Sequence, residues 1–324
     1  MMKGLNRIRG SSRVIGEVRN AVSIYATSDA TVLIDGETGT GKEVVARALH
    51  DEGGRASGPF VTVDCGTIPE SLFESEIFGH ARGAFTGAAQ ARPGLVAAAN
   101  RGTLFLDEIE NLPLSQQGKI LRLLQEREFR PVGAEYIRSA DVRVVAATNR
   151  SLHTMVDAGQ FRVDLLFRLE VLRLRVPPLR ERLEDLEALL ESLVARAGAC
   201  PRTVYLAPSD AQFAKLRARS WPGNVRELAN LVERAAALAP ALGWAVAWHA
   251  AIVGARPGAQ LSHFPAEWGM GRLVSEREQR QVARVRDALE RNRWRREATA
   301  RDLGISRVTL WRQMRRLGLE ARAS

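Results

Sequence analysis

The pattern of apolar and polar positions divides the chain near residue 177. Before that point, short apolar runs rich in β-branched residues alternate with stretches whose apolar positions recur at helical spacing. Such alternation predicts an α/β fold with a parallel sheet. The runs predicted as strands are Thr31–Ile34, Phe60–Cys65, Thr103–Asp107, Val142–Ala147 and Val171–Val176. The predicted helices include Val14–Ala26, Val44–His50 and Ser115–Arg127, with Ser115 as candidate N-cap.

After Pro177 and Pro178 only helical patterns follow, at Glu184–Ala197, Ser209–Arg219 and Asn224–Ala239. The next stretch is rich in Gly and Pro, which is typical of a linker. We therefore predict four parts: an α/β subdomain over residues 1–176, a helical subdomain over 177–253, a linker over 254–272 and a small helical domain over 273–324.

The segment Ala235–Ala255 contains no Asp, Glu, Lys or Arg and is long enough to span a bilayer. It is rich in alanine, and Trp244 and Trp248 lie near its middle rather than at its ends, where membrane proteins place them. We interpret it as the packed end of the helical subdomain followed by a loop, so we expect no membrane contact.

The composition limits the protein classes to which the chain can belong. The 324 residues are 45% hydrophobic and carry two cysteines, Cys65 and Cys200, which provide no disulfide framework or metal cluster. The polar, basic start has no apolar segment of a signal peptide, so a cytoplasmic location is expected. The net charge is +10, and the stretch from Arg272 to the end holds fifteen arginines against seven acidic residues. Such a basic segment is typical of nucleic-acid binding, although a solvated helix face can have the same composition.

A glycine-rich run stands between the first predicted strand and a predicted helix; it is Gly36-Glu37-Thr38-Gly39-Thr40-Gly41-Lys42-Glu43. In this context it predicts a P-loop rather than a flexible turn. Its glycines let backbone N–H groups face the phosphates of ATP, and Lys42 adds a positive charge. Glu43 stands where the general pattern has a hydroxyl ligand for Mg²⁺, so the metal would depend on a downstream acid and on water.

Further candidate residues follow two later strands. Asp107 and Glu108 end an apolar strand, and we interpret them as the Mg²⁺ ligand and the residue that orients the attacking water. A polar turn is the alternative. Asn149 follows another strand and is a candidate contact of the γ-phosphate. Arg162 and Arg168 are either surface salt-bridge residues or arginine fingers that reach a neighbouring subunit's phosphate.

A loop motif indicates the family. Small residues make it mobile, and Phe85 and Thr86 give it an apolar and hydrogen-bonding tip; it is Gly83-Ala84-Phe85-Thr86-Gly87-Ala88. It resembles the loop with which bacterial sigma-54-dependent transcription activators, ATPases of the AAA+ class, contact sigma-54. A purely structural glycine loop is disfavoured because the match is complete and lies between the second and third strands.

The resemblance extends from about Val14 to Leu319. It implies an AAA+ P-loop parallel sheet with a helical lid subdomain, followed by a small all-α helix-turn-helix domain of the Fis type. It also implies ATP and Mg²⁺ as cofactors, and Glu43 matches the family's own P-loop. The roles it implies are adenine contact for Ile15, Walker B for Asp107 and Glu108, sensor I for Thr148 and Asn149, trans-acting arginines for Arg162 and Arg168, and sensor II for Arg226.

In the tail, Gly304 would form the turn of the helix-turn-helix. The residues implied in contact with DNA are Ser306, Arg307, Thr309, Arg312 and Gln313. The implied partners are sigma-54 RNA polymerase, double-stranded enhancer DNA and further copies of the chain in a hexameric ring. Only about a dozen residues precede Val14, so we expect no receiver domain, and control by a partner protein or by the expression level.

Asp64 departs from the family, which usually has Asn there to hold the catalytic Glu. An ionised Asp64 can only accept hydrogen bonds and places a like charge near Glu108. Either the two share a proton and the restraint survives, or repulsion leaves Glu108 free. Three functions remain in competition: an ATPase that remodels the sigma-54 closed complex, a non-catalytic DNA-binding regulator, and an AAA+ machine with another substrate. The intact loop and Glu108 favour the first.

Overall fold

The computed structural model describes residues 4–86, 88–197, 207–254, 287–289, 291–292, 296–304 and 310. The chain forms two compact units, one of residues 1–193 with 219–230 and one of residues 194–218 with 231–324.

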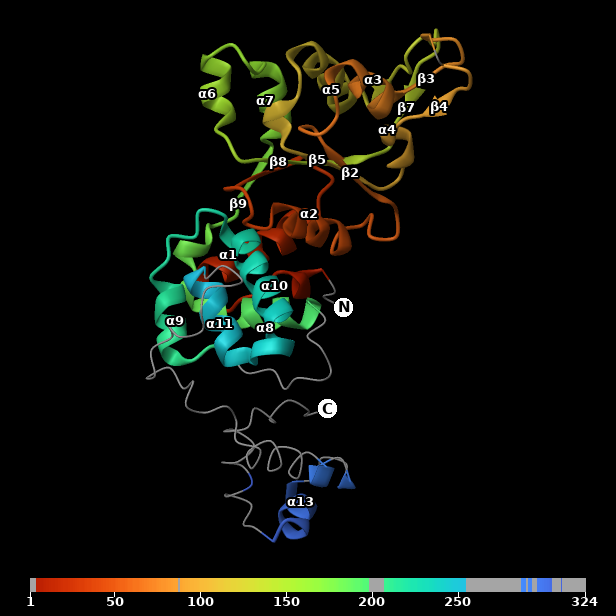
Figure 1. Cartoon of the computed structure of the whole chain (residues 1–324). Helices are drawn as coiled ribbons and strands as arrows, with labels where there is room; N and C mark the ends of the chain where they lie inside the picture. Colours follow the sequence, from red (N-terminus) through yellow and green to blue (C-terminus); the bar gives the residue numbers. More distant parts are fainter. Residues whose placement is uncertain are drawn as a thin grey trace. The chain divides into compact units, whose positions relative to one another are not determined.

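The first unit is built on a five-stranded parallel sheet in the order β2-β5-β8-β1-β9 (Figure 1). Its strands are β1 (Val32–Asp35), β2 (Phe60–Asp64), β5 (Thr103–Asp107), β8 (Arg143–Thr148) and β9 (Leu172–Arg175). Every bound lies within one residue of the sequence prediction, so the predicted parallel α/β sheet is confirmed. Continuous apolar runs predict these strands well because helices cover both faces of the sheet.

Alternate residues of each strand enter two separate cores. Leu104 and Leu106 of β5 face the core formed with α3 (Glu70–Phe78), α4 (Leu95–Ala98), α5 (Leu114–Glu126), α6 (Leu152–Asp157) and α7 (Val163–Leu169). Phe105 faces the other core, formed with α1 (Arg13–Tyr25) and α2 (Lys42–Asp51). Figure 1 shows the sheet between these two helical layers. The strand ends are therefore held rigidly from both sides.

The N-cap prediction for α5 is wrong. The helix begins at Leu114 with Pro113 as N-cap. The Ser115 hydroxyl instead donates a hydrogen bond to Glu70 Oε1 at 3.0 Å. Proline is tolerated at this N-cap because its missing N–H is not needed by the helix.

Two short antiparallel pairs extend from the sheet, and the sequence pattern did not predict them. The pair β3 (Gly79–His80) and β4 (Arg92–Pro93) encloses the loop that begins at Gly83, and β6 (Glu128–Phe129) pairs with β7 (Arg138–Ser139). Two-residue strands are too short to show a periodic pattern.

The helices outside the sheet match the predicted helical region. They are η3 (Leu179–Glu181), η4 (Leu183–Asp185), α8 (Leu186–Arg196), α9 (Asp210–Arg217), α10 (Asn224–Leu242) and α11 (Trp244–Val253). Helix α9 starts with a capping box in which Ser209 and Gln212 satisfy each other's backbone N–H groups.

The described residues 235–254 of the uncharged segment form the end of α10, then α11 and its C-cap Gly254, where the sequence predicted a helix end followed by a loop. Trp244 and Trp248 are buried side by side, with ring centroids 5.7 Å apart. The segment therefore belongs to a packed core, as expected. In the described part of the chain, no helix combines the length and apolar character needed to cross a membrane.

In the C-terminal part, α13 (Arg296–Asp302) is followed by Gly304 at φ +68°. A left-handed residue at this point suits the end of a helix at a turn. The residues predicted to contact DNA, namely Ser306, Arg307, Thr309, Arg312 and Gln313, lie outside the described residues.

Candidate nucleotide-binding site

The predicted P-loop joins the end of β1 to the start of α2. Gly39 (φ +78°) and Gly41 (φ +102°) adopt left-handed conformations, which a residue with a side chain rarely takes. Helix α2 begins at Lys42, so its N-terminal N–H groups face the loop and suit an anion.

Lys42 is buried within this loop, with only 8% of its surface exposed. Its Nζ donates to the carbonyl oxygens of Gly36 at 2.8 Å and Glu37 at 3.3 Å. Burial lowers the pKa of Lys42, while the nearby carboxylates of Asp107, Glu110 and Glu108 oppose this shift. The ammonium group is thus held at the position where a phosphate would meet the loop.

The P-loop is braced by two residues that the sequence analysis did not single out, Arg180 and Asn224. The fully buried Asn224 donates to Thr38 O at 3.0 Å and to Glu37 Oε2 at 3.1 Å, and its Oδ1 accepts from Leu179 N–H at 2.7 Å. Arg180 forms an ion pair with Glu37. Asn224 lies two residues before Arg226, to which the sequence analysis gave the sensor II role. This proximity is the sequence signal that could have predicted Asn224 near the nucleotide site.

The same segment touches the loop through its backbone. The N–H of Arg226 donates to Gly39 O at 3.2 Å, while its side chain is exposed. A Cβ atom added at Gly39 would lie 2.4 Å from Gly223 O. Gly39 is therefore required both for its backbone conformation and for this close approach.

Ile15 was predicted to contact adenine. It is 1% exposed and packs in the core formed with α2, and its N–H donates to the N-cap Ser12 at 3.3 Å. Ser12 is in turn held by the buried carboxylate of Asp185, which accepts from its N–H and its hydroxyl. The contacts of Ile15 show packing, and its role toward adenine stays a prediction.

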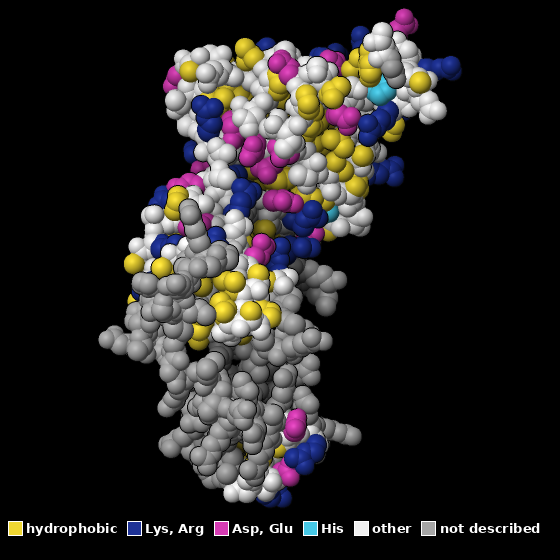
Figure 2. Space-filling model, viewed as in Figure 1, with side chains coloured by type: hydrophobic (Ala, Val, Ile, Leu, Met, Phe, Trp, Pro, Cys, Tyr) yellow, Lys and Arg dark blue, Asp and Glu magenta, His cyan; other side chains and the backbone are white. Residues whose placement is uncertain are grey.

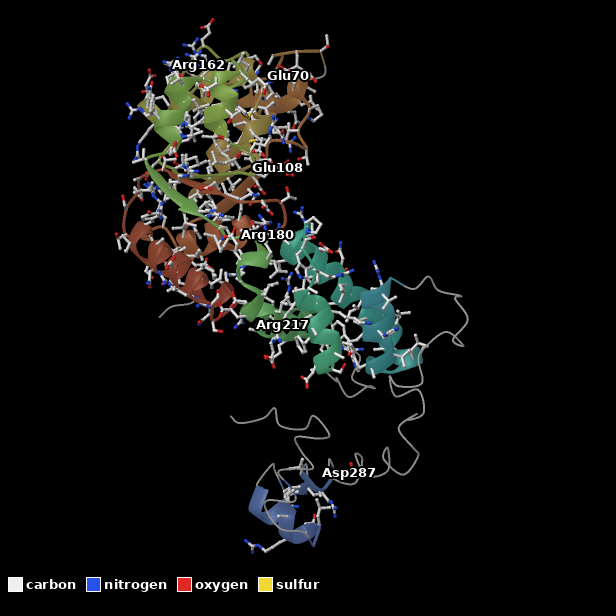
Figure 3. The ribbon with its side chains drawn as sticks, turned by 90° about the vertical axis from the view of Figure 1, so that its left-hand side faces the viewer. Glu70, Glu108, Arg162, Arg180, Arg217 and Asp287 are labelled. Atoms are coloured by element: carbon white, nitrogen blue, oxygen red, sulfur yellow. The ribbon has the colours of Figure 1, made fainter. Side chains whose placement is uncertain are left out.

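Asp107 and Glu108 lie at the carboxyl end of β5, at the same edge of the sheet as the P-loop. The Oδ1 atom of Asp107 accepts from Glu108 N–H at 3.0 Å, and burial raises the pKa of Asp107 while Lys42 opposes the rise. Glu108 has φ +51° and ψ +46°, a left-handed conformation that is uncommon for a residue with a side chain. Figure 3 shows Glu108 and Arg180 at this edge. Strain of this kind clusters at functional sites.

The residues fit a magnesium ion held mainly by a bound nucleotide. Among the described residues, no group of three His, Cys, Asp or Glu side chains can hold a metal on its own. Mg²⁺ is usually bound by one or two carboxylates together with phosphate oxygens and water. The half-buried carboxylate of Asp107, with Lys42 nearby, can supply one such oxygen.

Asn149 follows β8, the strand next to β5. Its backbone N–H donates to Glu110 Oε1 at 3.3 Å, and its side chain is exposed. Glu110 is 5% exposed, and its other oxygen has no hydrogen-bond partner among the described residues. Thr148 is buried, with its hydroxyl donating to Arg150 O at 2.9 Å. Asp107, Glu108 and Asn149 therefore lie at the carboxyl ends of two adjacent strands.

Asp64 ends β2 opposite Asp107 in the strand register. Its Oδ1 accepts from Gly66 N–H at 2.9 Å. No hydrogen bond joins Asp64 to Glu108 in the described part of the chain; the Glu108 carboxylate instead accepts from Asn111 Nδ2 at 3.0 Å. Position 64 therefore has a carboxylate, and the amide that donates to Glu108 belongs to Asn111.

The two candidate trans-acting arginines lie away from this edge, on and before α7. Arg162, which Figure 3 shows far from Glu108, forms two hydrogen bonds to Asp164, at 3.0 and 2.7 Å. Arg168 is exposed, and its side chain makes no hydrogen bond or ion pair within the described residues. Figure 2 shows acidic and basic side chains interspersed on the displayed face. Within the described residues, neither arginine is hydrogen-bonded or ion-paired to the P-loop of its own chain, and their action in trans stays a prediction.

The candidate sigma-54 loop is described except for Gly87. Its ends are closed by a hydrogen bond from Gly83 N–H to Ala88 O at 2.8 Å. Phe85 is 43% exposed and lies edge-on to His80, with ring centroids 5.0 Å apart. Ala84 and Thr86 complete the described loop, and Thr86 is exposed. The motif therefore forms a closed loop that presents an aromatic side chain.

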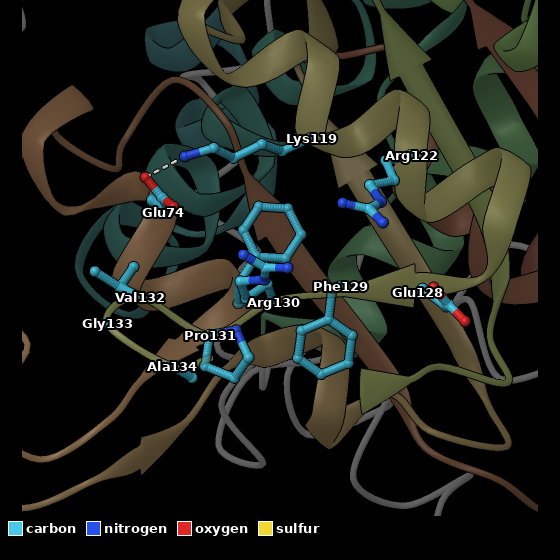
Figure 4. Close-up of a pocket in the computed structure, with 11 residues that line it drawn as sticks. Glu74, Lys119, Arg122, Glu128, Phe129, Arg130, Pro131, Val132, Gly133 and Ala134 are labelled. Carbon is cyan, nitrogen blue, oxygen red and sulfur yellow. Dashed lines mark ion pairs between the residues drawn. The ribbon is translucent and has the colours of Figure 1, made fainter. Parts of the chain in front are cut away.

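The base of this loop rests on residues 131–134. Ala81 N–H donates to Val132 O at 2.9 Å, and Val132 N–H donates to Gly79 O at 2.8 Å. Gly133 lies against Ala84, where a Cβ atom would come within 2.7 Å. Beside this contact, α3, α5 and the segment from Glu128 to Ala134 line a cavity of about 290 Å³ (Figure 4). The loop is thus anchored to the second small hairpin.

A five-stranded parallel sheet with a P-loop after β1 and an acidic pair after β5 defines a P-loop NTPase fold of the AAA+ class. The chain matches three family models: the sigma-54 interaction domain over residues 8–175, the AAA+ ATPase lid domain over 180–244 and the Fis family of bacterial regulatory proteins over 277–317. The chain belongs to the family of sigma-54-dependent transcriptional activators.

Individual relatives agree with this placement. The response regulator protein PilR of Pseudomonas aeruginosa is 42% identical over 316 residues, which are 97% of this chain and 70% of PilR. The regulatory protein AtoC of Escherichia coli is 50% identical over 210 residues, which are 65% of this chain and 46% of AtoC. The crystal structure of NtrX from Brucella abortus in complex with ATP superimposes with a TM-score of 0.65 at 33% identity, covering 95% of this chain and 68% of that one.

Proposed function

We propose that the protein hydrolyses ATP to remodel the closed complex of sigma-54 RNA polymerase, which it contacts through the loop Gly83–Ala88 while bound to upstream DNA. The observation that carries this proposal is the placement of Lys42, Asp107 and Glu108 at one edge of the sheet, together with an intact, anchored loop. The ATP complex of the related NtrX supports ATP as the nucleotide.

Each residue has a defined task in this proposal. The P-loop N–H groups and Lys42 bind the phosphates. Asp107 would supply an oxygen to Mg²⁺, and the metal would neutralise phosphate charge. Glu108 orients and polarises the attacking water. Arg168 or Arg162 stabilises the transferring phosphoryl group from a neighbouring subunit of a ring, proposed to be hexameric.

Two substitutions test the catalytic assignment. Glu108→Gln should bind ATP as the parent does and lose about 100-fold or more in turnover, because only water activation is removed. Lys42→Ala should weaken ATP binding itself. ATP affinity, steady-state hydrolysis and open-complex formation at a sigma-54 promoter are the measurements. Equal turnover in Glu108→Gln and the parent would refute the assignment of Glu108. A parent protein that binds ATP but does not hydrolyse it would instead make ATP a ligand of a DNA-binding regulator.

A further inference from the structure

The residues after β5 fold back on themselves in a single 3₁₀ turn, η2 (Ile109–Asn111), with Glu108 as its left-handed N-cap. Two hydrogen bonds join Asn111 to Glu108 in this turn. The N–H of Asn111 donates to Glu108 O at 2.9 Å, and its Nδ2 donates to Glu108 Oε2 at 3.0 Å. The backbone hydrogen bond fixes the turn, so the side-chain amide of Asn111 lies within hydrogen-bond distance of the Glu108 carboxylate.

Gly66 lies against the hydrogen bond between Asn111 and Glu108. A Cβ atom at position 66 would lie 2.7 Å from Glu108 Oε2 and 2.9 Å from Asn111 Nδ2. Gly66 lies two residues after the end of β2, which is the edge strand on one side of β5. The P-loop follows β1, which lies on the opposite side of β5 beyond β8. The Glu108 oxygen bound by Asn111 is therefore turned toward β2 and away from the phosphate-binding loop.

No other described side chain can take over this role. Asn111 is the only described side chain that is hydrogen-bonded to the Glu108 carboxylate. The nearby Asp64 carboxylate is an acceptor for Gly66 N–H and, when ionised, has no hydrogen to donate. An amide that donates to a carboxylate forms a charge-assisted hydrogen bond, which is stronger than a neutral one.

We propose that Asn111 is a positioning residue that holds Glu108 in a withdrawn orientation and so restrains ATP hydrolysis until the hydrogen bond is released. The inference rests on the proposed ATPase activity and concerns the regulation of that same site. Water activation requires Glu108 to turn toward the nucleotide, and breaking the contact with Asn111 is part of the free-energy cost of that turn.

The test compares basal ATP hydrolysis by the full chain and two variants, Asn111→Ala and Asn111→Asp, over a range of ATP concentrations. Both variants lack the donor, so kcat should rise about tenfold, equivalent to about 1.4 kcal/mol, with KM unchanged. A merely structural role would instead lower the melting temperature and kcat together. Asn100→Ala is the matched control, since it removes an amide side chain whose hydrogen bond, within the described residues, is accepted from Asp141 N–H, and it should leave kcat unchanged.

The double variant Glu108→Gln/Asn111→Ala should be as inactive as Glu108→Gln, because the gain in kcat depends on the freed carboxylate. A kcat that is unchanged or lower in Asn111→Ala, with the parent hydrolysing ATP normally, overturns the inference alone. A parent protein that hydrolyses no ATP overturns the proposed function and this inference with it.

Discussion

The carboxylate of Glu37 lies in the fork of the Arg180 guanidinium, with Oε2 2.8 Å from Nη1 and Oε1 2.5 Å from Nη2. The hydrogen bonds from Arg180 and then from Asn224 lower the pKa of Glu37 to about 2. Glu37 therefore stays ionised and paired at neutral pH. This pairing offsets a negative charge in the loop that is proposed to bind phosphates.

The first prediction concerns pH. Because its folded-state pKa is lowered, Glu37 contributes stability above its ordinary pKa near 4.5, and this contribution is lost as the pH falls toward 2. Glu37→Gln keeps the size and removes the charge. It should lower the free energy of unfolding at pH 6 by less than about 1 kcal/mol, since both partners are nearly half exposed. Urea unfolding at pH 6 and pH 3 should show the difference shrinking; a constant difference would contradict the assignment.

Asn224→Ala should both destabilise the protein and weaken ATP binding. It leaves the Leu179 N–H without its partner and frees Thr38 O and Glu37 from the P-loop brace. We expect a loss of about 2–3 kcal/mol in unfolding free energy. Asn224 has φ +51°, so Asn224→Gly, which tolerates this conformation, should be about 1 kcal/mol less destabilised. Equal stability of the two variants would show that the backbone strain is negligible.

Arg168→Ala should reduce ATP hydrolysis more than Arg162→Ala. Arg168 is exposed and, within the described residues, unpaired, whereas Arg162 must first leave Asp164. If Arg168 acts in trans, mixing Arg168→Ala with Glu108→Gln subunits should restore part of the activity at mixed interfaces. Arg122→Ala, which removes an exposed arginine paired with Glu126, serves as control. Mixtures that never exceed the summed activities of the separate variants would count against trans action.

Thr86→Ala should separate hydrolysis from transcription. Thr86 is exposed on the loop, remote from the P-loop along the chain, so its loss removes a hydroxyl without disturbing Lys42 or Glu108. ATP turnover should match the parent, while open-complex formation at a sigma-54 promoter should fail. Transcription at the parent's rate would remove the loop from the proposed mechanism.

Removal of residues 272–324 should abolish specific DNA binding and leave ATP hydrolysis intact. The binding of the full chain should weaken steeply with salt, because a basic tail releases counterions from the phosphates. A footprinting titration at two salt concentrations checks both points. A truncated protein that still protects an enhancer site would contradict the assignment of the tail.

The sequence predicted the strands and the P-loop well because each is a contiguous signal. The brace on the P-loop was missed because Arg180 and Asn224 lie far along the chain from Glu37, and only the tertiary fold brings them together. Asn111 was missed for a local reason. It lies three residues after Glu108, and its contact depends on the single left-handed residue that starts the 3₁₀ turn.

The alternation along β5 also limits how the length of this protein can vary. Leu104 and Leu106 enter one core and Phe105 the other, so a single inserted residue would exchange the faces of all side chains beyond it. The insertion would bury Asp107 in an apolar layer and expel leucines from it. Insertions and deletions in natural variants should therefore avoid the segment from Gly102 to Asp107 and gather in exposed connections such as residues 134–137.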